Sequence, residues 1–561
     1  MTAAEMAARG WEELDVLLIS GDAYVDHPAF GPAVIGRVLE AEGLRVGVIA
    51  QPDWKTPESL RIMGRPRLFC GITAGNLDSM LSNYTAARHK RKEDDYSPGG
   101  ITGLRPNRAS IVYTQLAKQA FSKLPIILGG IEAGMRRVVH YDYWQDKLCP
   151  SILHDAKADL LVYGMGERAI REIAHRLLHQ QPLAGIPGTA RLLGGNDSAA
   201  LDLTHSVRLP SWEECRKEPR ALIELTKLIE REQNPFTGKP LIQFHGERAL
   251  LIEPPAEPLS TKELDRVYEL PYTRHPHPSY REPIPAWVMI RDSITVVRGC
   301  GGGCTFCGLG MHQGRFLSSR SEESVAHEVK RIAEDAAFHG TITDLGGPTA
   351  NLYGCRNGDT EACRTCRRAS CLFPAICPNL KDDPAPALRL MRRIRELPEV
   401  KHVFIQSGIR MDVALRHPDY LRELARHHVS GHLKVAPEHL HPEVLKRMRK
   451  PGPDTFQRFM QLFTEESRAA GLKQYLVPYF ISNFPGSTTE EMQAVEDFVK
   501  KERWNLQQVQ DYIPLPMTPA AAMYYSGLDY ETGQPIAVIR GLAERRTQMK
   551  QLRPTGTHRK K

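Results

Sequence analysis

The sequence predicts an α/β protein with two successive regions in which strands and helices alternate. Apolar runs of strand length end in glycine-containing turns and are followed by helical stretches, first within residues 1–200 and again within residues 286–545. This pattern is typical of parallel sheets covered by helices. We therefore expect a doubly wound parallel sheet at the N-terminus. A partial (β/α)6 barrel should follow, since about six β/α units are too few for a complete eight-unit barrel.

The N-terminal region, residues 1–200, contains five predicted strands. They cover residues 15–22, 45–54, 67–75, 124–133 and 158–167. Ligands of doubly wound sheets bind at the carboxyl ends of the strands, where glycine turns leave room for them. Asp22, Glu132 and Glu167 should gather at this edge.

The second region, residues 286–545, contains six predicted strands. They cover residues 293–300, 341–351, 400–410, 431–439, 473–486 and 504–516. Residues 201–285 are expected to form a connector, because their last part is rich in proline. Residues 546–561 are predicted to be a disordered tail.

Length and composition indicate a cytoplasmic protein of several domains. A chain of 561 residues exceeds one core and predicts about three to four domains. Its 41% hydrophobic and 25% charged residues are ordinary for a soluble protein. No run approaches the roughly 18 apolar residues of a membrane helix, and acidic residues stand early in the chain, where a signal peptide would be apolar. We expect no membrane partner.

The distribution of the eleven cysteines favours metal or redox chemistry over a disulfide framework. Cys70, Cys149 and Cys215 stand alone, whereas the other eight lie between residues 300 and 377.

The segment RGCGGGCTFC (298–307) brings Cys300, Cys304 and Cys307 onto one glycine-rich loop after a predicted strand. Structural zinc requires four ligands, and His312 is the nearest candidate for a fourth. A 4Fe–4S cube usually takes four cysteines as well, so three would leave one iron open to a substrate or cofactor. Glycine permits positive φ angles and lets backbone N–H groups turn toward the sulfurs.

This CxxxCxxC loop, with Phe306 before its last cysteine, resembles that of the radical S-adenosylmethionine (radical SAM) enzymes. The resemblance implies that Cys300, Cys304 and Cys307 bind a 4Fe–4S cluster whose open iron chelates S-adenosyl-L-methionine. It also implies that the reduced cluster cleaves this cofactor to a 5′-deoxyadenosyl radical.

Segments downstream resemble the cofactor-binding motifs of the same superfamily. DLGGPTAN (344–351) resembles the segment after the second strand, with Pro348 where an acid often stands; IQSGIR (405–410), VAPEH (435–439) and FISNFPG (480–486) resemble segments of the fourth, fifth and sixth strands. The last of these packs on adenine in the superfamily. The resemblance assigns cofactor binding to Gly346, Gly347, Pro348, Thr349, Ser407, Arg410 and Glu438. It assigns no catalytic residue beyond them.

Further motifs at 21–31, 49–54, 129–137 and 163–168 make the whole chain similar to the YgiQ family of radical SAM proteins, which has no settled reaction. The first region also resembles the cobalamin-binding domain found before some radical SAM barrels. A DxHxxG histidine can hold cobalamin there, but YVDHPAFG places Asp26 beside His27 and does not meet this pattern. We therefore do not expect cobalamin.

A second cysteine group occupies residues 353–380. Its members are Cys355, Cys363, Cys366, Cys371 and Cys377. They could bind structural zinc, an auxiliary iron–sulfur cluster, or no metal, as free or redox-active thiols. Because this insertion leaves the barrel rim beside the GGPT segment, we expect it to lie near the three-cysteine loop.

The leading hypothesis is an enzyme that cleaves S-adenosylmethionine reductively and starts radical chemistry on an unknown substrate, with a reductant such as flavodoxin or ferredoxin as partner. The alternative is a non-catalytic metal-binding module. Such a module would dock RNA, a nucleic acid, through the basic runs at 88–92 and 557–561.

Overall fold

A computed structural model describes residues 1–504, 506 and 509–553 of the chain. The chain forms two compact units. The first consists of Met1–Arg291, Met311–Gly314 and Arg364–Arg368, and the second of the remaining residues from Asp292 onward.

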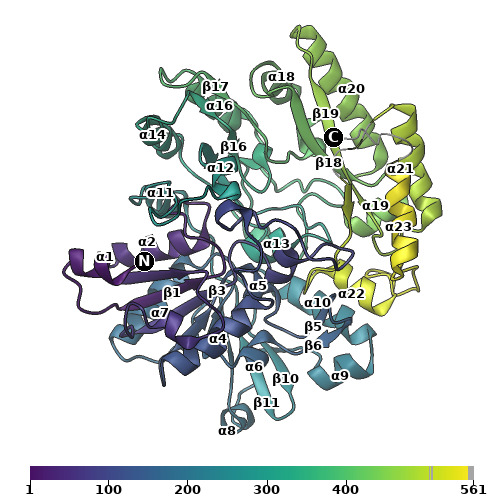
Figure 1. Cartoon of the computed structure of the whole chain (residues 1–561). Helices are drawn as coiled ribbons and strands as arrows, with labels where there is room; N and C mark the ends of the chain where they lie inside the picture. Colours follow the sequence, from purple (N-terminus) through teal and green to yellow (C-terminus); the bar gives the residue numbers. More distant parts are fainter. Residues whose placement is uncertain (505, 507–508, 554–561) are drawn as a thin grey trace. The chain divides into compact units, whose positions relative to one another are not determined.

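The first unit is built around one large sheet (Figure 1). The sheet has nine strands in the order β2-β1-β3-β4-β7-β8-β11-β10-β9. The strands are β1 (Val16–Ser20), β2 (Val46–Ala50), β3 (Phe69–Thr73), β4 (Ile126–Leu128), β7 (Leu160–Val162), β8 (Thr189–Leu192), β9 (Val207–Arg208), β10 (Leu241–His245) and β11 (Arg248–Ile252). The five strands from β2 to β7 are parallel, and β8 is antiparallel to β7. The parallel part has the order of a doubly wound sheet that reverses between β1 and β3, which confirms the predicted fold class.

One face of this sheet is covered by α2 (Gly31–Ala41) and α7 (Glu167–Leu178), which pack against each other. Alternate strand residues such as Val16 and Leu18 share an apolar cluster with these helices, as the two-residue period of a strand requires. Helix α4 (Ala109–Ala120) packs on β3 and β4 outside that cluster, and against α6 (Ile152–Ala156).

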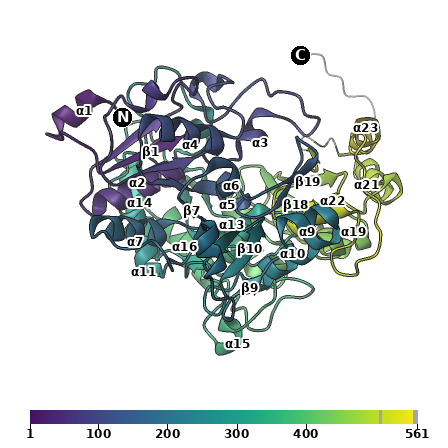
Figure 2. The same ribbon diagram turned by 90° about the horizontal axis from the view of Figure 1, so that it is seen from below.

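Residues 201–285, expected to be a connector, instead extend the sheet. The segment LIQFHGERALLI forms the antiparallel hairpin β10–β11, and β9 pairs with β10. Gly246 has a φ of +61° in the hairpin turn, a value that glycine adopts without strain. The prediction was wrong because two short apolar runs joined by a Gly-Glu turn, a hairpin signal, precede the proline-rich segment on which the prediction rested. Helices α9 (Trp212–Lys217) and α10 (Arg220–Glu232) pack together beside the hairpin (Figure 2).

The remaining elements of the first unit are short. They are α1 (Ala3–Ala8), η1 (Pro57–Leu60), α3 (Ser79–Asn83), η2 (Pro98–Gly100), α5 (Gly130–Met135), β5 (His140–Asp142), β6 (Lys147–Cys149), α8 (Gly195–Ala199), α11 (Thr261–Tyr268) and α12 (Pro285–Ile290).

The second unit contains strands at the six predicted positions. They are β12 (Ser293–Thr295) with β13 (Val297–Arg298), β15 (Thr341–Ile342) with β16 (Asp344–Gly346), β17 (His402–Val403), β18 (His432–Glu438), β19 (Tyr475–Ser482) and β20 (Val509–Asp511). Neighbouring positions pair in parallel as β12–β16, β15–β17, β18–β19 and β19–β20. This arrangement confirms the partial (β/α)6 barrel.

Five helices follow the first five strand positions and cover the barrel. They are α14 (Glu322–Ala333), α16 (Ala385–Arg395), α18 (Pro418–His427), α20 (Pro453–Ala469) and α21 (Thr489–Lys501). Their apolar faces meet the outward residues of the strands in one cluster, for example Val329, Leu424 and Phe459 with Ile342 and Leu433.

The remaining elements after Asp292 are short, and α13 and α15 each include residues of the first unit. They are α13 (Gly308–Gln313), β14 (Ser318–Ser319), η3 (Ala350–Leu352), α15 (Glu361–Arg364), α17 (Met411–Ala414), α19 (Pro442–Met448), α22 (Pro519–Ser526) and α23 (Leu542–Gln551). Helix α23 includes residues 546–551 of the predicted disordered tail, because Gln548 is buried and bonded to the Ser487 carbonyl and the Asn483 N–H. Residues 554–561 lie outside the described residues. Within the described ranges, no helix combines the length and apolarity needed to cross a membrane.

Candidate functional site

The loop of Cys300, Cys304 and Cys307 follows β13 and takes its shape from glycine. Gly299 and Gly303 have φ angles of +84° and +62°, in the left-handed region that glycine tolerates. A Cβ on Gly299 would overlap the Phe316 carbonyl oxygen. The loop therefore admits no side chain at this turn.

The cysteine side chains gather around the middle of this loop. A Cβ on Gly302 would lie 3.4 Å from Cys300 Sγ and 3.7 Å from Cys304 Sγ. Burial raises the pKa of Cys304, and burial together with the Cys304 thiol raises that of Cys307 to about 12. Thiols bind metals as thiolates, so this loop needs positive charge nearby to hold them deprotonated.

Two buried cations supply that charge. Arg410 Nη1 lies 3.8 Å from Cys304 Sγ, and both Arg410 and Lys450 lower the pKa of that thiol against the effect of burial. Asp412 holds Arg410 with two hydrogen bonds of 2.9 Å and 2.6 Å. Lys450 Nζ lies 3.9 Å from Glu438 Oε1.

This donor set fits a 4Fe–4S cluster better than a single metal ion. No three His, Cys, Asp or Glu side chains in the described part of the chain converge as one ion requires. Structural zinc needs four ligands around one point, whereas each thiolate of a cube binds a different iron, so the sulfurs need not converge.

The GGPT segment lies against the same loop. Parallel pairing of β12 with β16 brings Gly347 so close that its Cβ would lie 2.5 Å from the Val297 carbonyl oxygen. Thr349 Oγ1 lies 3.9 Å from Cys300 Sγ and donates to the Pro348 carbonyl oxygen at 2.8 Å. The two motifs thus meet as expected from their strand ends.

Ser407 is joined to the GGPT segment through Asp344. The carboxylate of Asp344 accepts from Gln406 N at 2.8 Å, from Ser407 N at 3.0 Å and from Ser407 Oγ at 3.2 Å. Ser407 Oγ in turn accepts from Gly347 N at 3.4 Å, and a Cβ on Gly346 would overlap this oxygen. Burial raises the pKa of Asp344, although these hydrogen bonds oppose the effect.

Arg410 is fixed by Asn351 at the end of the same segment. Its N–H donates to Asn351 Oδ1 at 2.8 Å, and Asn351 Nδ2 donates to its carbonyl oxygen at 2.9 Å. Asp344, Asn351, Asp412 and Lys450 were not among the predicted site residues. The first two stand inside DLGGPTAN and Asp412 two residues after IQSGIR, which is a local signal, whereas Lys450 lies outside the motifs.

Glu438 ends β18 after an irregularity in its pairing with β19 and has a φ of +69°. It is buried, and burial raises the pKa of its carboxyl while Lys450 and Arg410 oppose the effect. The Phe306 ring meets Phe484 of FISNFPG edge to face at 6.2 Å. IQSGIR, VAPEH and FISNFPG lie at the third, fourth and fifth strand positions of this barrel, whereas the superfamily segments that they resemble belong to the fourth, fifth and sixth strands.

Comparison with known proteins covers both units. Residues 1–293 match the family described as Radical SAM N-terminal, and residues 294–499 match the Radical SAM superfamily. A UPF0313 protein of Geobacter sulfurreducens is 48% identical over 551 residues, covering 98% of this chain and 91% of its own. UPF0313 protein YgiQ of Escherichia coli is 43% identical over 583 residues, covering 94% and 79%.

The chain belongs to the YgiQ family of radical SAM proteins. It is a radical SAM enzyme that binds a 4Fe–4S cluster and S-adenosylmethionine. Nothing in these comparisons supports the alternative of a non-catalytic RNA-docking module. Among solved structures, the radical SAM methyltransferase TsrM of Kitasatospora setae, with cobalamin and a 4Fe–4S cluster bound, has a TM-score of 0.50 at 17% identity, covering 90% of this chain and 76% of its own. This likeness shows the fold.

In this YgiQ-family chain, the side chains of the N-terminal sheet occupy its own carboxyl edge between β1 and β3. A Cβ on Gly75 would overlap the Asp22 carboxylate, and Arg105 lies over Gly21. His27 accepts from Ala29 N at 3.1 Å as a turn histidine. The absence of cobalamin stays a prediction.

Glu132 and Glu167 also lie at this edge of the sheet. Glu132 accepts from Ser79 N at 2.7 Å and from Ser110 N at 2.9 Å. Glu167 is buried in the first turn of α7. The Glu132 carboxylate thus holds the adjoining loops together.

The second cysteine group divides into different surroundings. Cys355 packs in an apolar cluster with Leu352, Leu372 and Leu380, and its thiol donates to the Asn351 carbonyl oxygen at 3.8 Å. Burial raises its pKa to about 12, and its place in a second metal site stays a prediction.

The other four cysteines remain candidates for a second site. Cys371 Sγ accepts from Asn357 Nδ2, and Cys366 Sγ from Arg368 N, each at 3.4 Å. Cys377 N donates to the Cys371 carbonyl oxygen at 2.8 Å, and Cys363 N to Thr360 Oγ1 at 3.2 Å. The eleven cysteines, all within the described residues, form no disulfide. A second cluster or zinc site stays a prediction.

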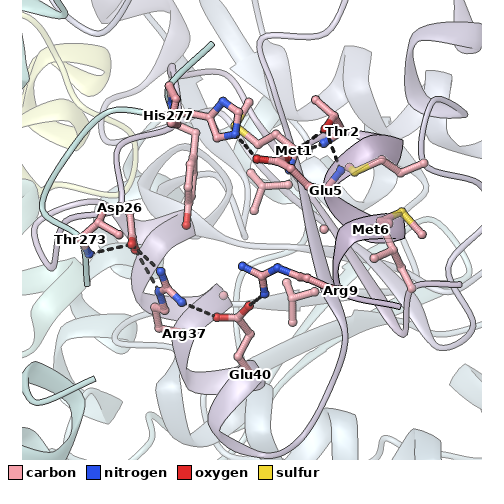
Figure 3. Close-up of a pocket in the computed structure, with 18 of the residues that line it drawn as sticks. Met1, Thr2, Glu5, Met6, Arg9, Asp26, Arg37, Glu40, Thr273 and His277 are labelled. Carbon is pink, nitrogen blue, oxygen red and sulfur yellow. Dashed lines mark hydrogen bonds and ion pairs between the residues drawn. The ribbon is translucent and has the colours of Figure 1, made fainter. Parts of the chain in front are cut away.

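The first unit also holds a cavity of about 200 Å³ beside α1 and α2 (Figure 3). Its charged groups pair with one another: Arg37 bonds Asp26 at 2.5 Å and Glu40 at 2.8 Å, and His277 bonds Glu5 at 2.7 Å. None of the residues assigned to the cluster or the cofactor lines it.

Proposed function

We propose that this enzyme uses Cys300, Cys304 and Cys307 to hold a cluster with one open iron, binds S-adenosylmethionine there, and begins radical chemistry by taking a hydrogen atom from a substrate not yet identified. The observation that carries the proposal is the convergence of this thiol loop, the GGPT segment and two buried cations. When bound, the cluster supplies the electron that cleaves the cofactor reductively.

The chain's own residues have separate tasks in this proposal. Arg410 and Lys450 stabilise the three thiolates, because both cations are buried beside Cys304. Glu438 and the GGPT backbone receive the polar groups of the methionine and ribose ends. Phe306 and Phe484 cover the adenine, since their edge-to-face pair leaves apolar ring surface next to the loop.

Electrons would come from a small reductant such as flavodoxin or ferredoxin. The test begins with protein whose cluster is reconstituted anaerobically, with dithionite in place of that partner and S-adenosylmethionine added. We expect 5′-deoxyadenosine to form, measured by liquid chromatography and mass spectrometry.

Two variants complete this experiment, one that removes the cluster ligands and one that serves as a control. The triple variant C300A/C304A/C307A should give no 5′-deoxyadenosine, whereas C215A, which changes a buried cysteine of α9, should match the wild type. Product from the triple variant, or none from wild-type protein with a full iron load, would refute the proposed function.

A further inference from the structure

The cysteine-rich insertion holds the three-cysteine loop directly. Ser370 Oγ donates to the Gly302 carbonyl oxygen at 2.7 Å and lies 3.3 Å from that of Gly301. The N–H of Cys371 donates to the Gly301 carbonyl oxygen at 2.8 Å. Two consecutive carbonyl groups of the loop are therefore fixed by two consecutive residues of the insertion.

Close packing of the two backbones reinforces these hydrogen bonds. A Cβ on Gly303 would lie 2.6 Å from the Ala369 carbonyl oxygen and 2.8 Å from Ser370 Cβ. A Cβ on Gly301 would lie 3.3 Å from Cys371 Cβ. The glycines of the loop thus serve this contact as well as its tight turn.

The hydroxyl of Ser370 donates one hydrogen bond and accepts two. Its side chain is buried, and its oxygen accepts from Leu372 N at 3.0 Å and from Phe373 N at 2.9 Å while donating to the loop. Removal of the hydroxyl would leave a loop carbonyl and two insertion N–H groups without this partner, and unmade bonds of buried groups are costly.

A second contact ties the insertion to the segment that follows the loop. Asn357 Nδ2 donates to the Arg315 carbonyl oxygen at 2.9 Å, and its Oδ1 accepts from Leu317 N at 2.8 Å. The same amide also donates to Cys371 Sγ. The insertion is thereby anchored both to the three-cysteine loop and to the segment that follows this loop.

The direction of the fixed carbonyls sets the direction of the amides between them. In a trans peptide the N–H points opposite to the preceding carbonyl. With the Gly301 and Gly302 carbonyls facing Ser370 and Cys371, the N–H groups of Gly302 and Gly303 face away from the insertion. The sulfurs of Cys300 and Cys304 lie next to Gly302, 3.4 Å and 3.7 Å from the place a Cβ would take there.

We propose that Ser370 is a positioning residue that aims the Gly302 and Gly303 amides at the cluster, an inference that rests on cluster binding in the proposed function. N–H groups directed at cluster sulfurs stabilise the added negative charge of the reduced state, so they raise its reduction potential. The insertion sets this potential through its contact with the loop, whether or not its own cysteines hold a metal.

The test is the midpoint potential of the cluster in reconstituted full-length protein, from an anaerobic redox titration followed by electron paramagnetic resonance. We expect S370A to have a more negative midpoint than the wild type. S370T, which retains the hydroxyl, should lie closer to the wild type than S370A. The matched control is S467A, which removes another buried serine hydroxyl of the second unit, one bonded to Gln474.

Iron content and the thermal unfolding of each apoprotein separate positioning from folding. Loss of iron from S370A with an unfolding midpoint like that of S467A also supports the inference. A wild-type potential in S370A overturns it, as does a potential lowered equally in S370A and S467A. Failure of the wild type to form 5′-deoxyadenosine would count against the proposed function but would leave this comparison of potentials intact.

Discussion

The carboxyl edges of the two parallel sheets both carry a glycine turn, but different side chains lie beside it. In the N-terminal sheet, the glycine turn after β3 is covered by Asp22, which pairs with the fully buried Arg105 at 3.0 Å; Arg105 also pairs with Asp94 at 3.0 Å. In the barrel, the glycine loop after β13 is bordered by thiols and two cations.

A glycine turn at a strand end therefore marks space without determining which side chains or ligands fill it. In the first unit the chain's own ion pairs occupy that space. In the second unit the neighbouring groups are thiols, which in a radical SAM enzyme bind iron.

The largest effect is expected where a thiol is a ligand. C304A should lose the S-adenosylmethionine-dependent change in the electron paramagnetic resonance spectrum and most of its cluster iron, because the cube loses one of three protein ligands. C70A removes a buried thiol of β3. Burial alone raises the pKa of Cys70, and no cation among the described residues lowers it. C70A should keep both signals, and equal iron loss in the two variants would remove the contrast between the edges.

The next effect concerns the ion pairs that fill the first edge. R105M leaves Asp22 and Asp94 buried without their cation, and breaking a buried pair typically costs about 3–5 kcal/mol. The free energy of unfolding, from urea titration of the apoprotein, should fall accordingly. R61M, which breaks an exposed pair with Glu58, should cost at most about 1 kcal/mol. A similar loss of unfolding free energy in R105M and R61M would show that the ion pairs of Arg105 do not stabilise the first edge.

A smaller effect is expected at the cofactor pocket of the second edge. E438A and S407A should weaken S-adenosylmethionine binding about ten- to a hundredfold, or about 1.5–3 kcal/mol, with iron content unchanged. R410A should weaken binding too, and should also retain less iron because this cation contacts Cys304. Anaerobic calorimetry measures the affinities. Unchanged affinity in all three variants would leave these side chains with a purely structural role.

The sequence pointed to the chemistry of the barrel edge because its parts are local. Cys300, Cys304 and Cys307 share one loop, and GGPT follows one strand, so their resemblance to the radical SAM motifs was visible in short segments. Lys450 and Asp344 act through partners distant in the chain, namely Glu438 and Ser407. Contacts of this kind depend on strand pairing, which the apolar pattern does not specify residue by residue.

The contrast at the first edge was hidden for the same reason. Asp22, Arg105 and Asp94 are separated by up to 83 positions and meet only after the sheet has formed. The role of Ser370 was equally hidden, because its partners Gly301 and Gly302 lie 69 and 68 positions away.

The smallest effect is a pH dependence at the first edge. Burial raises the pKa of Asp22 to about 6, from an ordinary 3.8, although Arg105 opposes the shift. The folded state therefore binds the proton more tightly, and the stability from this group is present below about pH 4 and lost as pH rises through about 6. D22N should remove that decline, changing the pH profile of the thermal midpoint by a few degrees. Identical pH profiles of the thermal midpoint for D22N and wild type would contradict the raised pKa of Asp22.

The nine-stranded sheet ends in β9, a strand of only two residues, Val207–Arg208. Short, charged edge strands offer few unpaired backbone groups to another molecule and so discourage aggregation. A fragment ended at residue 200 would lose β9 to β11 and leave the backbone of β8, which pairs with β11 through Ala190, Arg191 and Leu192, as a bare edge. Such a fragment should self-associate, whereas one that continues to residue 291 keeps its natural border.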